Sequence, residues 1–321
     1  MKVFITKELP GNPEKMLRKN GFKVTIHKGN RPVSRRELIK ESADADALIC
    51  LLTDKIDREI IAGLKKCRVI ANVAVGFNNI DIGAATEKNI IVTNTPDILT
   101  DATADLTMAL LLAAARRIPE GERMMRANAF KGWKPDLLLG VELKNKILGI
   151  AGAGRIGSAV AQRAKAFGMK IIYTDHKQNP VIDIEEGAEM VPLNTLLKKS
   201  DIISFHLPLN QTTRHILNCA NIKHLKRNAI IINTSRGEII EEECLIKALK
   251  EKKILAAGLD VYENEPEINK EFLKLENVVL LPHIGSATRE TRANMASLAA
   301  VNVLNILKGK EAQTPVNRIN N

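Results

Sequence analysis

Three glycines at fixed spacing indicate a site for a phosphate-bearing cofactor. Gly152, Gly154 and Gly157 form a G-x-G-x-x-G motif directly after residues 146–150, a short apolar run typical of a buried parallel strand. The first glycine permits a tight turn, the second lets a pyrophosphate approach the backbone, and the third lets the following helix pack close to the sheet. Free N–H groups at the start of that helix would bind the phosphates. Alone, the motif is weak evidence, because ordinary glycine-rich turns share it.

An acidic residue downstream supports the cofactor interpretation. A second apolar run, residues 170–173, is followed by Asp175, which lies 18 residues after Gly157. An acid at this place in a βαβ unit accepts hydrogen bonds from ribose hydroxyls. Because strand, glycines, helix, second strand and acid occur in this order, the sequence predicts dinucleotide binding.

Three polar residues that follow later apolar runs could carry the chemistry. Arg236, Glu265 and His283 each have an ordinary explanation when taken singly: a surface ion pair, a solvated loop acid and a buried histidine. Together they fall at the carboxyl edge of the sheet that binds the dinucleotide, where ligands of open α/β sheets bind. Reduction of a ketone needs a cation for the substrate carboxylate, a proton donor for the alkoxide and an acid that orients the donor. Arginine, histidine and glutamate supply these functions.

Short apolar strands must position these residues, and they alternate with helices along the chain, which predicts parallel α/β sheets. The expected strands cover residues 1–6, 22–26, 47–52, 69–73, 90–92, 146–150, 170–173, 201–205, 229–233, 256–261 and 278–281. The expected helices cover residues 11–19, 34–41, 56–64, a long apolar segment through 116, 158–167, 218–225, 241–251 and 288–309. We expect Ser34 to cap the second helix and Asp101 or Thr103 to cap the long apolar one. Residues 128–145 are expected to be irregular, with Trp133 in a core.

The loop of residues 75–81, Val-Gly-Phe-Asn-Asn-Ile-Asp, follows a predicted buried strand. It is either a ligand-binding loop at the carboxyl end of that strand or a plain turn between strand and helix. The residue types alone do not decide between these two interpretations.

Composition narrows the class of protein. The 321 residues suit two domains, and an apolar content of 45% is ordinary for a globular protein. The net charge of +11 comes from scattered basic pairs interleaved with acids, and ten aromatic residues are too few for a nucleic-acid stacking platform. We therefore expect no nucleic-acid partner but a basic surface that attracts small anions.

The termini and cysteines indicate no secretion, membrane span or metal site. Residues 1–6 read as a strand and not as a signal peptide, and the longest apolar run is half a membrane span. Cys50, Cys67, Cys219 and Cys244 form no C-x-x-C pair and join no histidine cluster. We expect buried thiols in a reducing compartment, hence a cytoplasmic protein without a membrane partner.

Four segments in order resemble the D-isomer-specific 2-hydroxyacid dehydrogenase family. They are residues 152–157 (Gly-Ala-Gly-Arg-Ile-Gly), 233–237 (Asn-Thr-Ser-Arg-Gly), 258–266 (Gly-Leu-Asp-Val through Glu-Pro) and 282–286 (Pro-His-Ile-Gly-Ser). Within that family, residues 75–81 and 95–105 are most similar to glyoxylate/hydroxypyruvate reductases. The resemblance covers nearly the full length of the chain.

The resemblance implies a fold and a set of roles. It implies two doubly wound parallel-sheet domains, with a Rossmann-type cofactor domain (100–286) inserted in a flavodoxin-like substrate domain (1–99 plus 287–321). It implies a homodimer and hinge closure through two crossover helices. Cofactor contacts are expected at Thr103, Gly152, Gly154, Arg155, Ile156, Gly157, Asp175, His206, Pro208, Thr234, Ser235, Asp260 and Gly285. Substrate contacts are expected at Leu52, Val75, Gly76 and Arg236, with specificity set around Leu51, Leu52 and Phe77; the alternative to a core position for Trp133 is a contact in the same specificity pocket.

The implied activity is NAD(H)-dependent reduction of a short 2-oxo acid to the D-2-hydroxy acid, with His283, held by Glu265, as proton donor. NADPH-using relatives carry a neutral residue followed by arginine where this chain has Asp175, His176 and Lys177, so we expect NAD; the last two residues leave room for NADP. The alternatives are a phosphoglycerate dehydrogenase, a phosphite-oxidising relative and, from another class of protein, an NAD(H)-sensing corepressor-like binding protein. Formate dehydrogenase is disfavoured because it has a neutral amide at the position of Glu265.

Overall fold

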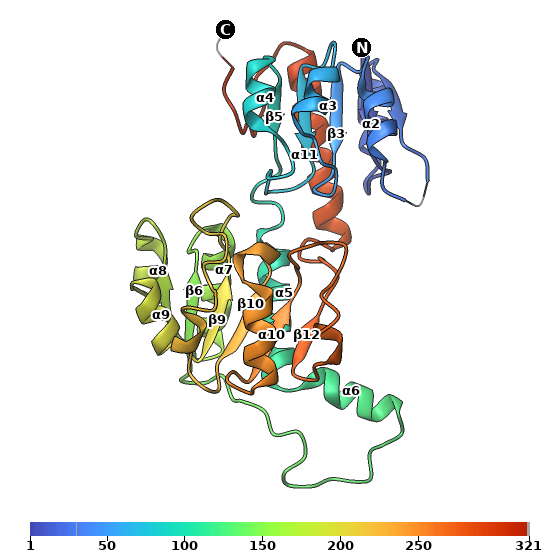
Figure 1. Cartoon of the computed structure of the whole chain (residues 1–321). Coiled ribbons are helices and arrows are strands. Elements are labelled where there is room, and N and C mark those ends of the chain that lie inside the picture. Colours follow the sequence, from blue (N-terminus) through green and yellow to red (C-terminus); the bar gives the residue numbers. More distant parts are fainter. Residues whose placement is uncertain (30, 320–321) are drawn as a thin grey trace. The chain divides into compact units, whose positions relative to one another are not determined.

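The computed structural model describes residues 1–29 and 31–319 and consists of two compact units (Figure 1). One unit combines residues 1–99 with residues 286–321, and the other comprises residues 100–285. The observed boundary near the C-terminus lies one residue before the expected one.

The first unit is built on a five-stranded sheet in which all pairings are parallel and the order is β2-β1-β3-β4-β5. This is the flavodoxin-like order. The strands are β1 (Lys2–Ile5), β2 (Lys23–Ile26), β3 (Ala47–Cys50), β4 (Val69–Asn72) and β5 (Ile91–Thr93). The helices are α1 (Pro13–Lys19), α2 (Arg35–Ser42), α3 (Arg58–Gly63), α4 (Ile82–Glu87) and α11 (Arg289–Leu307). Ser34 caps α2 in a capping box with Glu37, as expected.

Helices cover both faces of this sheet, and alternate strand residues point to opposite faces. Leu48 and Ile70 belong to a core that includes buried residues of α2, α3 and α4. Helix α11 packs against β3 and β4 and also against α1. Strands β3 and β4 are therefore buried throughout, as their continuous apolar runs predict, whereas the edge strand β2 is only partly buried.

The second unit contains a seven-stranded parallel sheet in the order β12-β11-β10-β9-β6-β7-β8. The order reverses between β6 and β9, which is the topological switch point of a Rossmann sheet. The strands are β6 (Ile147–Ala151), β7 (Lys170–Thr174), β8 (Glu189–Met190), β9 (Ile202–Phe205), β10 (Ile230–Asn233), β11 (Ala256–Leu259) and β12 (Val278–Leu280). The helices are α5 (Thr100–Ala115), α6 (Ile118–Arg126), α7 (Arg155–Ala166), α8 (Pro180–Glu185), α9 (Leu193–Lys199) and α10 (Glu242–Lys250). These two sheets confirm the predicted fold class.

Two separate cores flank the second sheet. Ile230 and Ile232 of β10 pack in a core with buried residues of α5 and α7. Ile231, between them, packs in another core with residues of α9 and α10. The alternation shows that helices cover both faces, and this leaves the two edges where strands begin and end as places for binding.

Several expected elements differ from the structure. Residues 218–225 do not form a helix; they contain only a 3₁₀ turn, Ile222–His224, because Asn218 and Asn221 side chains bond to nearby backbone groups instead. Helix α5 begins at Thr100, so neither Asp101 nor Thr103 is its cap. The short elements α4, α6, α8, β8 and α9 were not expected, since each spans too few residues for a clear periodic pattern.

Trp133 is not in a core. Its side chain is 81% exposed, in the irregular segment that follows α6, so the sequence expectation was wrong. Phe130 and Leu139 of the same segment are also exposed, and the preceding helix α6 contains no buried residue.

The cysteines also differ from the expectation of four buried thiols. Cys50 and Cys67 are buried and free, but Cys219 is exposed and forms a disulfide with Cys244 of α10, 25 residues away in sequence. Glu241 lies near both sulfurs, but bonded sulfurs are not thiolate ligands, and so this cluster is not a metal site. Among the described residues, no helix combines the length and apolar character needed to cross a membrane.

Candidate active site

The glycine turn leaves an open surface over the start of α7. Gly152 has a φ of 96°, and a Cβ there would lie 2.8 Å from the His206 carbonyl oxygen. A Cβ on Gly157 would lie 2.0 Å from the Gly152 carbonyl oxygen, so strand and helix pack closely. By contrast, a Cβ on Gly154 would meet no atom of the described chain within 4 Å. The turn therefore has the expected shape for a pyrophosphate, which would lie over Gly154 at the helix N-terminus.

Ala153, in the middle of this turn, is held from both sides by the loop after β7. Its N–H donates to Oδ2 of Asp175 at 2.8 Å, and its carbonyl accepts from Nδ2 of Asn179 at 2.7 Å. Nδ2 of Asn179 also donates to the Ser158 hydroxyl at 2.9 Å. The loop expected to contact the cofactor ribose thus also orders the glycine turn.

The other oxygen of Asp175 faces its neighbour in sequence. Oδ1 accepts from the His176 N–H at 2.6 Å and lies 2.5 Å from Nδ1 of that imidazole. The His176 side chain is 82% exposed. A histidine therefore lies beside the acid expected to select the cofactor.

The turn after β10 positions Arg236. Asn233, which is buried, accepts from the N–H and hydroxyl of Ser235 and donates to the Arg236 carbonyl at 2.9 Å. Gly237 packs directly against the next loop: a Cβ there would lie 1.9 Å from the Tyr262 carbonyl carbon. Burial lowers the pKa of Arg236, opposed by the charges of Glu265 and Glu238, but arginine remains a cation at any working pH.

Glu265 and His283 form a direct pair. Oε2 of Glu265 lies 2.7 Å from Nδ1 of His283, and Oε1 accepts the Tyr262 N–H at 3.1 Å. Burial opposes ionisation of Glu265, but the His283 hydrogen bond and charge, the Tyr262 N–H and the charge of Arg236 together lower its pKa. With Nδ1 facing the carboxylate, Nε2 is the ring nitrogen left for a substrate.

Asp260 fixes the loop that carries His283. Its two oxygens accept the N–H groups of Ile284 and Gly285 at 2.7 and 2.8 Å, and the hydroxyl of Thr103 donates to the Gly285 carbonyl at 3.2 Å. Burial raises the pKa of Asp260, with partial opposition from these N–H groups and His283. His283 itself has a φ of 53°, an uncommon backbone conformation for a residue with a side chain, and such positions persist where the surroundings hold them.

The remaining expected cofactor residues line the same edge. Burial lowers the pKa of His206 to about 3, so the ring is neutral, and its Nε2 lies 2.8 Å from the Ser204 hydroxyl. The Thr234 hydroxyl lies 2.9 Å from that of Thr107 on α5. Pro208 is exposed, and its carbonyl accepts from the Thr213 hydroxyl. The residues expected from the second unit thus all lie in turns after its strands, on α5 or in the first turn of α7.

The loop after β4 in the first unit is ordered by two asparagine side chains and presents two backbone N–H groups that have no acceptor in the described chain. Nδ2 of Asn94 donates to the Val75 carbonyl at 2.8 Å, and Nδ2 of Asn72 donates to the Gly76 carbonyl at 2.9 Å. Neither the Val75 N–H nor the Gly76 N–H has an acceptor within residues 1–29 and 31–319. Two adjacent free N–H groups suit a carboxylate, and this favours the ligand-binding interpretation that the sequence left open.

Leu52 is half-buried in the neighbouring loop after β3, beside Leu51, while Phe77 is 40% exposed. Sequence reasoning missed the asparagines that order these turns, namely Asn72, Asn79, Asn94 and Asn179. The available signal was their position within a few residues of a predicted strand end, where an amide can bond to loop backbone.

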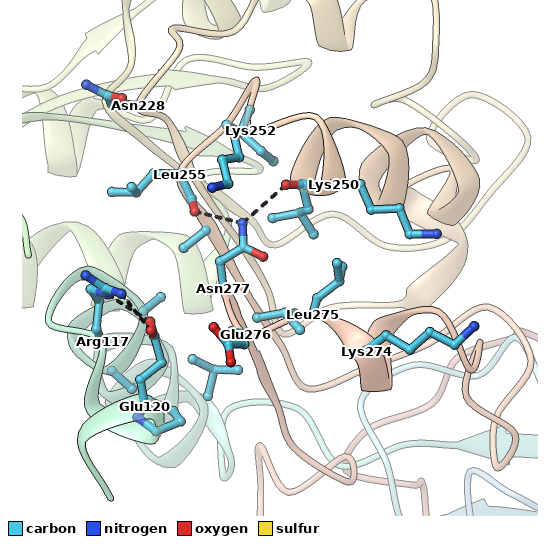
Figure 2. A pocket seen from close by; sticks show the side chains of 18 of the residues that line it. Arg117, Glu120, Asn228, Lys250, Lys252, Leu255, Lys274, Leu275, Glu276 and Asn277 are labelled. Atoms are coloured by element: carbon cyan, nitrogen blue, oxygen red, sulfur yellow. Dashed lines mark hydrogen bonds and ion pairs between the residues drawn. The ribbon is translucent and has the colours of Figure 1, made fainter. Parts of the chain in front are cut away.

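A cavity of about 710 Å³ lies elsewhere in the second unit (Figure 2). Its lining includes residues that precede or begin β10, β11 and β12 and the ends of α5 and α10, such as Ala114, Asn228, Lys250, Ala256 and Val278. It therefore opens at the amino edge of the sheet, whereas Arg236, Glu265 and His283 follow the carboxyl edge. We do not assign it to the active site.

Known proteins are similar to this chain over nearly its whole length. Residues 108–285 match the family of the D-isomer specific 2-hydroxyacid dehydrogenase, NAD binding domain. A glyoxylate reductase of Thermococcus litoralis is 50% identical over 321 residues, which cover 99% of this chain and 97% of that protein. The TT0316 protein of Thermus thermophilus superposes with a TM-score of 0.94 at 42% identity, covering 99% of this chain and 100% of that one. A glyoxylate reductase from Paecilomyes thermophila superposes with a TM-score of 0.89 at 33% identity, with 98% of both chains covered.

Two more distant solved structures differ in the cofactor they contain. An NADPH-dependent glyoxylate/hydroxypyruvate reductase of Sinorhizobium meliloti, 29% identical, contains NADP and malonate (TM-score 0.86; 98% and 96% covered). A D-lactate dehydrogenase of Aquifex aeolicus, 27% identical, contains NAD and lactic acid (TM-score 0.86; 98% and 99% covered). This chain belongs to the D-isomer specific 2-hydroxyacid dehydrogenase family and is an NAD(P)-dependent oxidoreductase.

Proposed function

We propose that the protein reduces a short 2-oxo acid, glyoxylate or hydroxypyruvate, to the corresponding 2-hydroxy acid, of D configuration where the product is chiral. The observation that carries this proposal is the His283–Glu265 pair in the turns of the dinucleotide-binding sheet. When bound, the nicotinamide supplies a hydride to the C2 carbonyl carbon. Nε2 of His283 then gives its proton to the developing alkoxide oxygen, and Glu265 stabilises the imidazolium before this transfer.

Each unit, taken by itself, contains a candidate partner for the substrate carboxylate. In the first unit, the free N–H groups of Val75 and Gly76 bind carboxylate oxygens. In the second unit, Arg236 provides a fixed positive charge in a turn that Asn233 orders. Leu52 forms an apolar wall, so small side chains on the 2-oxo acid are favoured over large ones.

We propose NAD(H) as the preferred cofactor. The Asp175 carboxylate follows β7, where the adenosine ribose is expected, and would repel the 2′-phosphate of NADP(H). Its hydrogen bond to Ala153 keeps the charge at the glycine turn. His176 and Lys177 reduce this repulsion, which is why the cofactor preference needs a direct measurement.

A homodimer is also proposed. Helix α6 and the segment after it expose five large apolar side chains in a stretch of 22 residues, at Ile118, Met125, Phe130, Trp133 and Leu139. Apolar residues gathered in this way on one segment are typical of a protein–protein contact. Light scattering should give twice the chain mass of 35.4 kDa, and replacing Phe130 and Trp133 by serine should shift the mass toward one chain.

The deciding experiment for the function measures NADH oxidation with glyoxylate, hydroxypyruvate, 3-phosphohydroxypyruvate and pyruvate, repeated with NADPH. We expect the highest kcat/KM with glyoxylate or hydroxypyruvate and NADH. A preference for the phosphorylated acid would replace the proposal by a phosphoglycerate dehydrogenase. Absence of turnover with all four acids would overturn it.

A further inference from the structure

A chain of buried and half-buried polar side chains connects the two loops of the first unit to which the proposed function assigns substrate contacts. One loop follows β3 and contains Leu51 and Leu52, and the other follows β4 and contains Val75 and Gly76. Thr6, Asp54 and Asn72 are each at most 5% exposed, although all are polar. Buried polar groups are costly unless their hydrogen bonds are satisfied, so such a group in a small unit needs an explanation.

Asn79 joins the two loops directly. Its Nδ2 donates to the carbonyls of Leu51 and Asp54, both at 3.0 Å, and its Oδ1 accepts from Nδ2 of Asn72 at 3.2 Å. The same Asn72 nitrogen donates to the Gly76 carbonyl at 2.9 Å. One amide therefore holds the backbone of the β3 loop while its partner holds the peptide beside the free N–H groups of the β4 loop.

Asp54 closes the β3 loop onto the end of β1. Its Oδ2 accepts the Leu51 N–H at 2.8 Å and the Thr6 hydroxyl at 2.5 Å. Burial raises the pKa of Asp54, while these two donors lower it. The two hydrogen bonds therefore stabilise the ionised form of the buried carboxyl. The backbone adds one more connection, because the Ile56 N–H donates to the Asn79 carbonyl at 2.8 Å.

We propose that Asn79 and Asp54 are positioning residues that set the spacing of the two substrate loops. Neither residue touches the substrate in this proposal. Asn79 acts through Leu51 and, together with Asn72, through Gly76. Asp54 acts through Leu51 and Thr6. The inference rests on the proposed function, since it takes Val75, Gly76 and Leu52 as substrate contacts. A displacement of either loop would weaken carboxylate binding and leave the cofactor turn in the second unit intact.

The test compares Asn79→Ala with a matched asparagine of the same unit. Asn317, like Asn79, contacts three residues through its side chain, accepting from the Val92 N–H and donating to the Thr86 hydroxyl and the Ile90 carbonyl, but it holds the C-terminal segment and neither loop. We expect Asn79→Ala to raise KM for glyoxylate at least tenfold and to leave the Kd of NADH within twofold. Asn317→Ala should lower the unfolding midpoint with KM within twofold.

Thr6→Val and Asp54→Asn are milder substitutions that test the same hydrogen-bond chain. Thr6→Val keeps the side-chain shape and removes the donor to Asp54, so a two- to fivefold rise in KM is expected even if Asn79→Ala does not fold. Asp54→Asn keeps an acceptor oxygen and should restore most of the affinity lost in Asp54→Ala.

The outcomes separate the inference from the function. Wild-type protein that turns over no 2-oxo acid would refute the proposed function. Wild-type turnover with unchanged KM in the Asn79 and Thr6 variants would overturn the inference alone. An equal rise in KM in Asn317→Ala would overturn it too, because the effect would then report the stability of the unit.

Discussion

Nδ1 of His283 lies 2.7 Å from Oε2 of Glu265, although the two residues are 18 positions apart and follow different strands, β12 and β11. The pair is held by two backbone arrangements: Asp260 accepts the two N–H groups after His283, and the Tyr262 N–H donates to Glu265. The imidazole is thus oriented before any substrate arrives.

His283→Ala should lower kcat with glyoxylate by about 10²- to 10⁴-fold, the range for loss of a general acid, and leave the Kd of NADH near its wild-type value. Glu265→Gln should cause a smaller loss, because the ring remains but loses the negative charge that stabilises its protonated form. His215→Ala is the control: His215 also faces a glutamate, with Nε2 2.9 Å from Oε1 of Glu263, but has no assigned role in the reaction. Stopped-flow hydride transfer and NADH fluorescence separate the two readouts. Near-wild-type turnover in His283→Ala would contradict the assignment.

Gly154→Ala should weaken NADH binding at least tenfold, because the added methyl group occupies the space left for the pyrophosphate. The fold should tolerate it, with a change in unfolding free energy of less than about 1 kcal/mol, since Gly154 has an ordinary φ of −74° at the N-cap of α7. Gly157→Ala is the contrasting variant and should destabilise the fold, because its Cβ would lie 2.0 Å from the Gly152 carbonyl oxygen. Calorimetric titration and urea unfolding measure both effects. Unchanged NADH affinity in Gly154→Ala would place the cofactor elsewhere.

Asp175→Ser should narrow the preference for NADH over NADPH by about tenfold, which corresponds to about 1.4 kcal/mol. The variant removes the negative charge that would face a 2′-phosphate. Asp183→Ser is a matched control, an acid of α8 in the same unit that is bonded to Gln178 and not to the glycine turn. The ratio of kcat/KM for the two cofactors is the measurement. Equal discrimination in wild type and Asp175→Ser would show that another residue selects the cofactor.

His206 should make the fold sensitive to acid. Burial lowers its pKa in the folded chain to about 3, whereas an unfolded chain binds the proton near 6.5. Between these values the unfolded chain carries one more proton, so the free energy of unfolding falls as pH falls, by up to about 1.4 kcal/mol per pH unit from this residue. His206→Gln should flatten the decline between pH 6 and pH 4, roughly the window between the two values, in urea unfolding curves. His176→Gln, at an exposed position, is the control, and an unchanged slope in His206→Gln would rule out this contribution.

The Cys219–Cys244 disulfide should stabilise the second unit. Closing a loop with a sequence separation of 25 residues contributes about 3 kcal/mol in the chain-entropy description. Cys219→Ser should therefore lower the unfolding free energy by roughly this amount, and reduction of the wild-type protein should have the same effect. A titration of the unfolded, unreduced protein should find two thiols, those of Cys50 and Cys67. Four titratable thiols would contradict the bond.

The order of the glycine turn, the strands and the later Arg, Glu and His residues could be predicted because each depends on local pattern. An apolar run of four or five residues is buried wherever a parallel sheet forms, and a G-x-G-x-x-G turn has the same shape in any βαβ unit. The order of the strands other than β8, and the position of each candidate catalytic residue after a strand, therefore follow from residue types read along the chain.

Only the tertiary structure decided which distant groups meet. Asn79 lies 28 residues from Leu51, and Cys219 lies 25 residues from Cys244, and neither separation has a signature in sequence. The exposure of Trp133 could not be predicted from sequence either, because it depends on what packs over an irregular segment and not on the apolar character of the residue. Local propensity acts over one turn of helix or one strand, whereas these contacts depend on how whole elements pack, and that is a property of the complete fold.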